Sequence, residues 1–264
     1  MTARFFDIID WTRPWLAPFL PAAQSVLYDG NWCEQLNRAA AQARLHNHRG
    51  LPIRFVPQSE LPAGTAYEAF ISATGCVPTR ANLHDFLNAL VWLTFPGIKV
   101  RLNALQAAEI SRAPQAQTPR GKIRDAATIF DENAALLVTR SSDLIDALRA
   151  HHWQEAFMAR RAEFESVCEV WLFGHALMEK LVAPYKAITA HALPVVAEPG
   201  YFSLSDRGKT EWLDQTVARH LSKGLATSEL TPLPVLGVPG WWPGQTREFY
   251  ADTTVFRGKR SVGE

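Results

Sequence analysis

The chain has 264 residues, 47% of them apolar and 20% charged, which is ordinary globular composition and excludes general disorder. Its formal net charge of +1 gives no field favouring nucleic acid or an anionic membrane, so neither partner is expected. Three scattered cysteines exclude a disulfide scaffold, and no apolar run approaches the roughly 20 residues of a membrane span, so we expect a cytoplasmic protein.

The first 50 residues are expected to form a helical region. Prolines break residues 5–30 into short pieces, and residues 31–46 form a more regular helix. Residues 53–56 alternate like a short strand, whereas residues 67–73 fit a strand or a helical turn equally well.

Residues 82–110 carry the clearest helical pattern, which Pro96 divides into two helices. In the first of them, residues 83–95, apolar side chains cover nearly the whole circumference. A helix of this kind is buried, because no face of it is suited to water. We therefore expect it in the interior of the domain.

This buried helix nevertheless contains three polar residues, His84, Asp85 and Asn88. Each needs a partner, because an unpaired buried polar group costs roughly 1–3 kcal/mol. Asp85 fits a capping arrangement with Asn82 as well as it fits a functional role. His84 and Asn88 share one face at i, i+4, and this pair favours a functional role.

The next segment predicts a basic loop over residues 120–124 and then a β-hairpin. Its strands would be residues 126–130 and 134–139, around an acidic turn at residues 131–133. Oxygen-rich turns can bind a hard cation such as Mg²⁺, although Asp and Asn also cap their own backbone in turns. We keep Asp131 as a ligand candidate and assign its two neighbours to capping.

A serine-capped helix is predicted to end at residue 150, and residues 153–164 continue helically. Residues 167–173 then resemble a buried strand, after which Gly174 leads into a helix over residues 175–182.

His175 starts this helix at a strand-to-helix junction, where functional groups often lie, and Glu179 follows one turn later. A His/Glu pair at this spacing can present nitrogen and oxygen to one divalent metal. The alternative interpretation is a structural hydrogen bond between the two side chains, without a metal. His191 could join them only if the fold brings it close.

The last predicted helix covers residues 209–223, and a tail rich in proline and aromatic residues follows from residue 232. Such a tail could stack on a base or sugar, but we expect it to wrap the domain and bury its aromatic rings. The whole chain, residues 1–264, is thus predicted to be one mostly helical α+β domain with a small sheet or β-hairpin.

Several of these stretches together resemble a bacterial family catalogued as a domain of unknown function, family 3025. The similarity spans most of residues 67–260 and is carried by residues 77–92, 95–103, 124–133, 174–179, 184–191 and 249–257. The resemblance implies one domain running nearly end to end. It brings no activity, cofactor or catalytic residue with it.

Two functions fit the sequence, so whether the chain is an enzyme stays open. The leading hypothesis is a metal-dependent hydrolase that binds Zn²⁺, Mn²⁺ or Mg²⁺ and acts on a small anionic substrate. Its candidate residues are the metal ligands His84, Asp131, His175 and His191, the catalytic carboxylates Asp85 and Glu179, and the substrate-binding cations Arg80, Lys99 and Arg124. The alternative is a non-catalytic binding protein in which the polar residues form a buried, satisfied network.

Both hypotheses predict that the two polar elements meet, because polar groups in apolar elements need partners. We expect at least three of His84, Asp85, Asp131, His175, Glu179 and His191 to line one cleft near Arg80 or Arg124.

Overall fold

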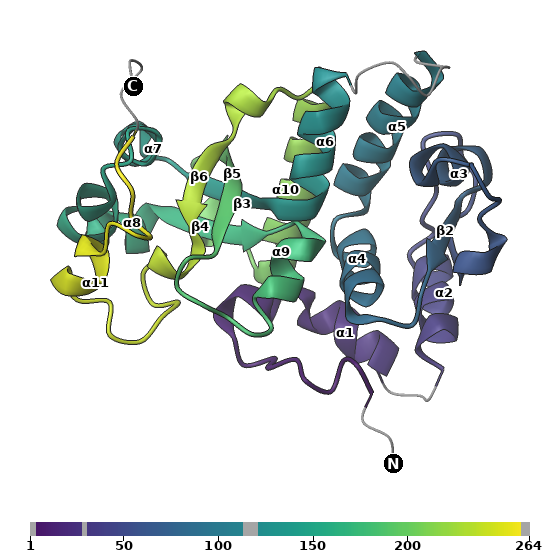
Figure 1. Ribbon diagram of the computed structural model, residues 1–264, viewed down its shortest axis with the longest axis horizontal. Coiled ribbons are helices and arrows are strands. Elements are labelled where there is room, and N and C mark those ends of the chain that lie inside the picture. The colour runs from purple at the N-terminus through teal and green to yellow at the C-terminus, as the bar shows by residue number, and fades with distance from the viewer. Residues whose placement is uncertain (1–3, 28–30, 113–120, 260–264) are drawn as a thin grey trace.

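The structure is a computed structural model that describes residues 4–27, 31–112 and 121–259. Its centre is a four-stranded sheet in the order β4-β3-β5-β6, with helices on both sides (Figure 1). The strands are β3 (Ala134–Thr139), β4 (Cys168–Leu172), β5 (Thr189–Val196) and β6 (Thr231–Pro234). The central strand β3 is antiparallel to β4 and parallel to β5.

A second, two-stranded parallel sheet joins β1 (Arg54–Pro57) to β2 (Cys76–Thr79). These two small sheets among many helices make the protein a mostly helical α+β protein, as predicted. None of the described helices has the length and apolar composition needed to cross a lipid bilayer.

The N-terminal region is helical, as predicted. It consists of a 3-10 helix, Pro14–Phe19, followed by α1 (Leu20–Leu27) and α2 (Trp32–Gln42). Asn31 caps α2 by accepting a hydrogen bond from the backbone of Glu34. The ambiguous segment after residue 66 is a helix, α3 (Tyr67–Thr74).

The long helical pattern forms α4 (Leu83–Thr94) and α5 (Pro96–Arg112), which Pro96 separates as predicted. Leu87 and Leu90 are fully buried and Trp92 is 1% exposed, so α4 is an interior helix. Asn82 caps it through the backbone N–H of Asp85.

The predicted hairpin is wrong, because its first strand and its turn belong to a helix, α6 (Lys122–Asn133). Residues Ala126, Ala127 and Phe130 recur at helical spacing and bury one helix face. A five-residue apolar run does not distinguish that spacing from a strand. The predicted basic loop is likewise the first turn of α6 from Lys122 onward, while Arg120 lies outside the described residues.

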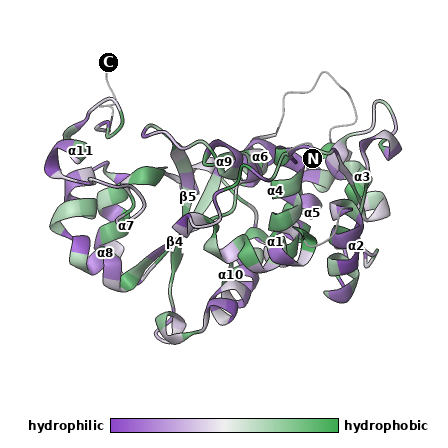
Figure 2. Cartoon of the chain, turned by 90° about the horizontal axis from the view of Figure 1, so that it is seen from below, coloured by the Kyte–Doolittle hydropathy of each residue, from purple (hydrophilic) through white to green (hydrophobic). Residues whose placement is uncertain are grey.

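The remaining helices follow the predicted order, except that the last one lies in the tail, where no helix was predicted. They are α7 (Ser142–Arg149), a π-helical turn (Glu155–Ala159), α8 (Arg161–Val167), α9 (His175–Lys180), α10 (Asp206–Leu221) and α11 (Arg247–Ala251). Short 3-10 turns cover residues 58–60, 201–203, 227–229 and 235–237. In two perpendicular views α7, α8 and α11 lie on one side of the sheet, and α2 and α3 lie at the far end on the other side (Figures 1 and 2).

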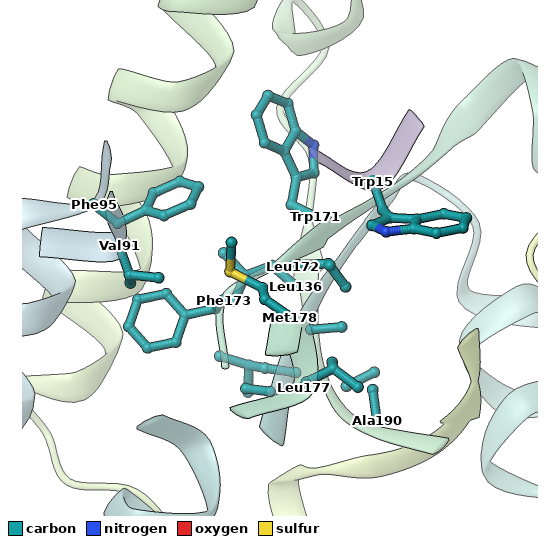
Figure 3. Packing of buried hydrophobic residues seen from close by; sticks show 14 of the residues in the cluster. Trp15, Val91, Phe95, Leu136, Trp171, Leu172, Phe173, Leu177, Met178 and Ala190 are labelled. Atoms are coloured by element: carbon teal, nitrogen blue, oxygen red, sulfur yellow. The ribbon is translucent and has the colours of Figure 1, made fainter. Parts of the chain in front are cut away.

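Apolar residues of α9 anchor it between α4 and the sheet. Leu177 and Met178 are fully buried, and they lie among Val91, Phe173 and Leu136 (Figure 3). Because this face holds α9 in the core, His175 and Glu179 are fixed relative to α4.

The aromatic tail packs on the protein, as predicted. Tyr250 is 2% exposed and donates its hydroxyl to the backbone oxygen of Gly237 at 2.8 Å. Farther along, the indole of Trp153 donates to the carbonyl of Arg257 at 2.7 Å. Trp241 and Phe249 are half-buried against the core.

Candidate functional site

Two histidines from distant parts of the chain face each other where α4 and α9 begin. His84 Nε2 lies 3.1 Å from His175 Nε2, and the two rings are nearly perpendicular, with centroids 4.5 Å apart. The sequence alone does not force these helices together, so tertiary packing creates the pair.

Glu132, in the last turn of α6, completes a three-residue group that we name the His–Glu–His cluster: His84, Glu132 and His175. Glu132 Oε2 lies 3.4 Å from His175 Nε2, and the potential ligand atoms of all three lie within 4.8 Å of one another. With Zn–N bonds of about 2.0–2.1 Å, tetrahedral ligand atoms are about 3.3 Å apart. The two short separations therefore match those of zinc ligands.

Glu179 lies behind His84 and accepts a hydrogen bond from it. Its Oε2 is 2.8 Å from His84 Nδ1. A proton on Nδ1 leaves the lone pair of Nε2 directed at His175 and Glu132, which is how carboxylates orient metal-binding histidines. Glu179 is thus placed to set the tautomer and the ring orientation of His84.

The cluster is buried on one side and open to solvent on the other. The His175 side chain is 5% exposed, whereas those of His84 and Glu132 are 30% and 43% exposed. Burial lowers the pKa of His175 to about 4, so its imidazole is neutral near pH 7, as metal binding requires. Burial, with the charge of Asp131, also raises the pKa of Glu132.

A glycine allows these elements to meet. A Cβ atom on Gly174 would lie 2.4 Å from the backbone nitrogen of Asn133 and 2.5 Å from that of Ala134. The backbone N–H groups of Phe173 and Gly174 both donate to the carbonyl of Ala134. The start of α9 is therefore pressed against the junction of α6 and β3, which places His175 beside Glu132.

A buried ion pair lies next to the cluster. Lys99 Nζ is 2.6 Å from Asp131 Oδ1 and 2.9 Å from Asn88 Oδ1, and the side chains of Lys99 and Asp131 are 4% and 11% exposed. Asn88 in turn donates to the hydroxyl of Tyr67. Burial alone would raise the pKa of Asp131, but the nearby positive charge of Lys99 and the interaction with His175 lower it. Asp131 is therefore ionised and bound to Lys99.

Asp85 is occupied by Arg80. Its carboxylate accepts the backbone N–H of Arg80 at 2.6 Å and the guanidinium Nε and Nη2 at 3.0 and 2.9 Å. The backbone N–H of Asp85 also takes part in the cap made by Asn82. This geometry supports the local interpretation of Asp85 rather than a place in the cluster.

Two further candidates lie apart from the cluster. His191, at the start of β5, is exposed and hydrogen-bonds to the side chain of Asn133. Arg124 is half-buried on α6, about two helical turns before Asp131. Within the described part of the chain its guanidinium has no ion-pair partner.

The structure thus brings His84, His175 and Glu179 together, with Asp131 in the neighbouring ion pair. Neither of the two cavities described in the protein includes a cluster residue. The larger, about 1190 Å³, lies between α1 and α10 and includes Trp171 and Asp214. Glu132, which the sequence assigned to a turn, is the functional candidate that sequence reasoning missed.

Comparison with known proteins identifies a family but no characterised relative. A family model described as "Protein of unknown function (DUF3025)" matches residues 53–260. No curated protein and no solved structure matches the chain.

Proposed function

The chain belongs to the DUF3025 family of proteins of unknown function, and from its geometry we propose that it is a divalent-metal-dependent hydrolase. The observation that carries this proposal is the His–Glu–His cluster, whose potential ligand atoms lie within 4.8 Å of one another. The partial exposure of the His84 and Glu132 side chains gives solvent access to the cluster.

In the proposed site His84, His175 and Glu132 bind the metal, and Glu179 orients His84. Two imidazoles and one carboxylate suit Zn²⁺ or Mn²⁺ better than Mg²⁺, which prefers oxygen ligands. Three protein ligands leave a coordination position open, as in catalytic zinc sites. A metal bound there lowers the pKa of a coordinated water molecule.

The reaction class follows from that chemistry. In hydrolysis, the oxygen of water forms a bond to the acyl or phosphoryl centre, the bond to the leaving group breaks, and the leaving group receives a proton. The protein positions the metal ligands and excludes part of the solvent. Asp131 and His191 are less suited to bind the same ion, because Lys99 and Asn133 already engage them.

A cytoplasmic location is part of the proposal. Cys33, Cys76 and Cys168 are all free thiols in the structure. Free, partly buried thiols are typical of a reducing compartment.

The alternative function is a binding protein in which the cluster only stabilises the core. The buried pair of Lys99 and Asp131, together with its bonds to Asn88 and Tyr67, favours this view, because its members satisfy one another. The two functions differ in whether the His–Glu–His cluster binds a metal.

Metal analysis separates the two functions. Protein purified without chelator or a nickel column should contain one equivalent of zinc or manganese by elemental mass spectrometry. The His84→Ala, His175→Ala and Glu132→Gln variants should lose the metal and remain folded, and the exposed His46→Ala control should retain it.

Activity then tests the reaction. Hydrolysis of a chromogenic ester or amide should require the metal and disappear in the same three variants. A metal-free wild-type protein that cannot be reconstituted, with variants that lose about 1–3 kcal/mol of stability, would establish the network function instead.

A further inference from the structure

Carboxylates outnumber the available cations around the His–Glu–His cluster. Glu132 belongs to the cluster, Glu179 bonds to His84, and Glu68 lies near enough to interact electrostatically with Asp131 and Glu132. Lys99, a cation that also faces this region, is bound to Asp131. A divalent metal would offset two of the three remaining negative charges and leave the site negative.

Two of the basic residues suited to hold an anion near the cluster, Arg80 and Lys99, are already paired, and the third, Arg124, lies about two helical turns before Asp131. Arg80 donates two guanidinium hydrogen bonds to Asp85, and Lys99 lies 2.6 Å from Asp131. An anionic substrate would thus face uncompensated carboxylates, which disfavours it. This charge distribution departs from the expectation of an anionic substrate.

Glu68 has the geometry of a cation-binding carboxylate. It lies in the first turn of α3, half-buried, and its Oε2 accepts a hydrogen bond of 2.7 Å from Asn103 Nδ2. Within the described residues it has no ion-pair partner. Burial raises the pKa of Glu68 to about 6, and the negative charge of Asp131 adds to the shift, whereas the positive charge of Lys99 and the hydrogen bond from Asn103 act in the opposite direction.

Asn103 supplies a second, independent observation. The residue is 1% exposed, and its Oδ1 is buried without a hydrogen-bond donor among the described residues. Buried acceptors of this kind are normally satisfied. A carboxylate without an ion-pair partner and an amide oxygen without a donor point to a ligand with several N–H groups and a positive charge, which describes an ammonium group.

We propose that the substrate carries a primary amine, and that Glu68 and Asn103 bind its ammonium group while the hydrolysed bond lies at the metal. This inference rests on the proposed function. It assigns Glu68 and Asn103 to substrate recognition rather than to catalysis.

Hydroxamates of matched length test the charge preference, because they bind a metal through one common group. Wild-type protein loaded with Co²⁺ is titrated with γ-aminobutyryl, butyryl and succinyl hydroxamates, and the visible absorption of Co²⁺ reports binding. The pH is kept above the pKa of about 6 of Glu68. We expect the amine to bind at least about fivefold tighter than the neutral compound, the gain of one partly buried ion pair, and the anion to bind weakest.

Two variants locate the preference. Glu68→Gln should bind Co²⁺ and butyryl hydroxamate as the wild type does but lose the preference for the amine. Glu60→Gln, an exposed carboxylate on the surface, should retain it. Because the comparison in wild type needs no variant, a misfolded Glu68→Gln protein does not obscure the result.

Failures of the two proposals are distinguishable. If folded wild-type protein does not bind Co²⁺, the proposed function is wrong, and the proposed ammonium-binding site at Glu68 and Asn103 is wrong as well. If Co²⁺ binds but the three hydroxamates bind equally, or the anion binds tightest, only the amine site is overturned. A preference unchanged in Glu68→Gln also overturns it.

Discussion

Lys99 holds one of the most buried positive charges in the protein. Besides Asp131 and Asn88, its ammonium contacts the face of Trp92, 5.4 Å from the ring centroid. These contacts join α4, α5 and α6 at a single atom. The ion pair therefore fixes the end of α6 that carries Glu132.

Removing one partner of this ion pair should lower the free energy of unfolding much more than removing both. Lys99→Met leaves Asp131 buried and unpaired and should lower the free energy of unfolding by about 3–5 kcal/mol. The double variant Lys99→Met with Asp131→Leu should recover most of that loss. Urea unfolding of both single variants and the double variant measures the coupling. Additive losses would mean that the pair contributes little.

Asp214 is a half-buried carboxylate that lies beyond the opposite end of α4. From α10 it accepts the backbone N–H groups of Gly97 and Ile98 at 2.9 and 2.8 Å, at the start of α5. Burial raises the pKa of Asp214 to about 6, although these two hydrogen bonds act in the opposite direction. The folded protein therefore binds a proton at Asp214 more tightly than the unfolded chain does.

This difference gives the stability a definite pH dependence. A carboxyl with a raised pKa stabilises the fold fully below its unfolded pKa of about 4, and that contribution is lost as the pH rises through about 6. Relative to Asp214→Asn, wild-type protein should gain up to about 3 kcal/mol between pH 7 and pH 4. Denaturant unfolding at several pH values measures the difference, and parallel profiles for the two proteins would contradict the raised pKa.

At the level of elements, the contact between α9 and the α6–β3 junction determines how close His175 lies to Glu132 in the site. Gly174→Ala places a methyl group against backbone atoms that cannot rotate away, so we expect a loss of about 1–3 kcal/mol. The same shift should separate His175 from Glu132 and weaken metal binding. Thermal unfolding and metal titration measure both effects.

Gly200→Ala is the matched control for this change. Gly200 has a φ of −87°, and nothing lies within 4 Å of a Cβ built on it, so alanine should be tolerated there. Equal losses of stability in the two variants would show that the effect comes from replacing any glycine and not from the contact at the junction.

The same junction explains where sequence reasoning succeeds and fails. Residues 83–95 are apolar all round, and this pattern alone predicts a buried helix. Residues 126–130 are too short a run to separate strand from helix spacing. A hairpin turn at residues 131–133 does not predict that the side chain of Glu132 faces a histidine.

Tertiary contacts decide what local patterns do not. The need of His84 and His175 for partners predicts that they meet, and they do. The position of Glu132 beside His175 depends on the close approach of the Gly174 backbone to the backbone of Asn133 and Ala134. A sequence pattern does not reveal such a contact. β5 was not predicted, and Pro194 within it interrupts the expected strand pattern.

At the level of the whole molecule, the core joins the two ends of the chain. Trp15 lies 5.6 Å from Trp241 between ring centroids, and Phe256 is buried with Phe157 and Tyr250 nearby. We therefore propose that residues 1–264 fold as one unit.

Removal of residues 237–264 should consequently unfold the whole protein, not only remove a surface segment. A chain ending at residue 236 lacks Tyr250 and Phe256, and truncation of one such core aromatic alone costs about 3–5 kcal/mol. Full-length protein should unfold in one cooperative transition by circular dichroism and by tryptophan fluorescence. A soluble truncated protein with an unchanged melting temperature would show that the tail is a separate appendage.

The position of β3 at the centre of the sheet also has a consequence for biosynthesis. All six of its residues are buried, yet every neighbouring strand of its sheet lies later in the chain, up to residues 231–234. At about 5–20 residues per second, β3 leaves the ribosome several seconds before the strands that complete the sheet. During this interval an apolar strand with unpaired edges is exposed, so the nascent chain should be a client for chaperones until the last third of the protein has been made.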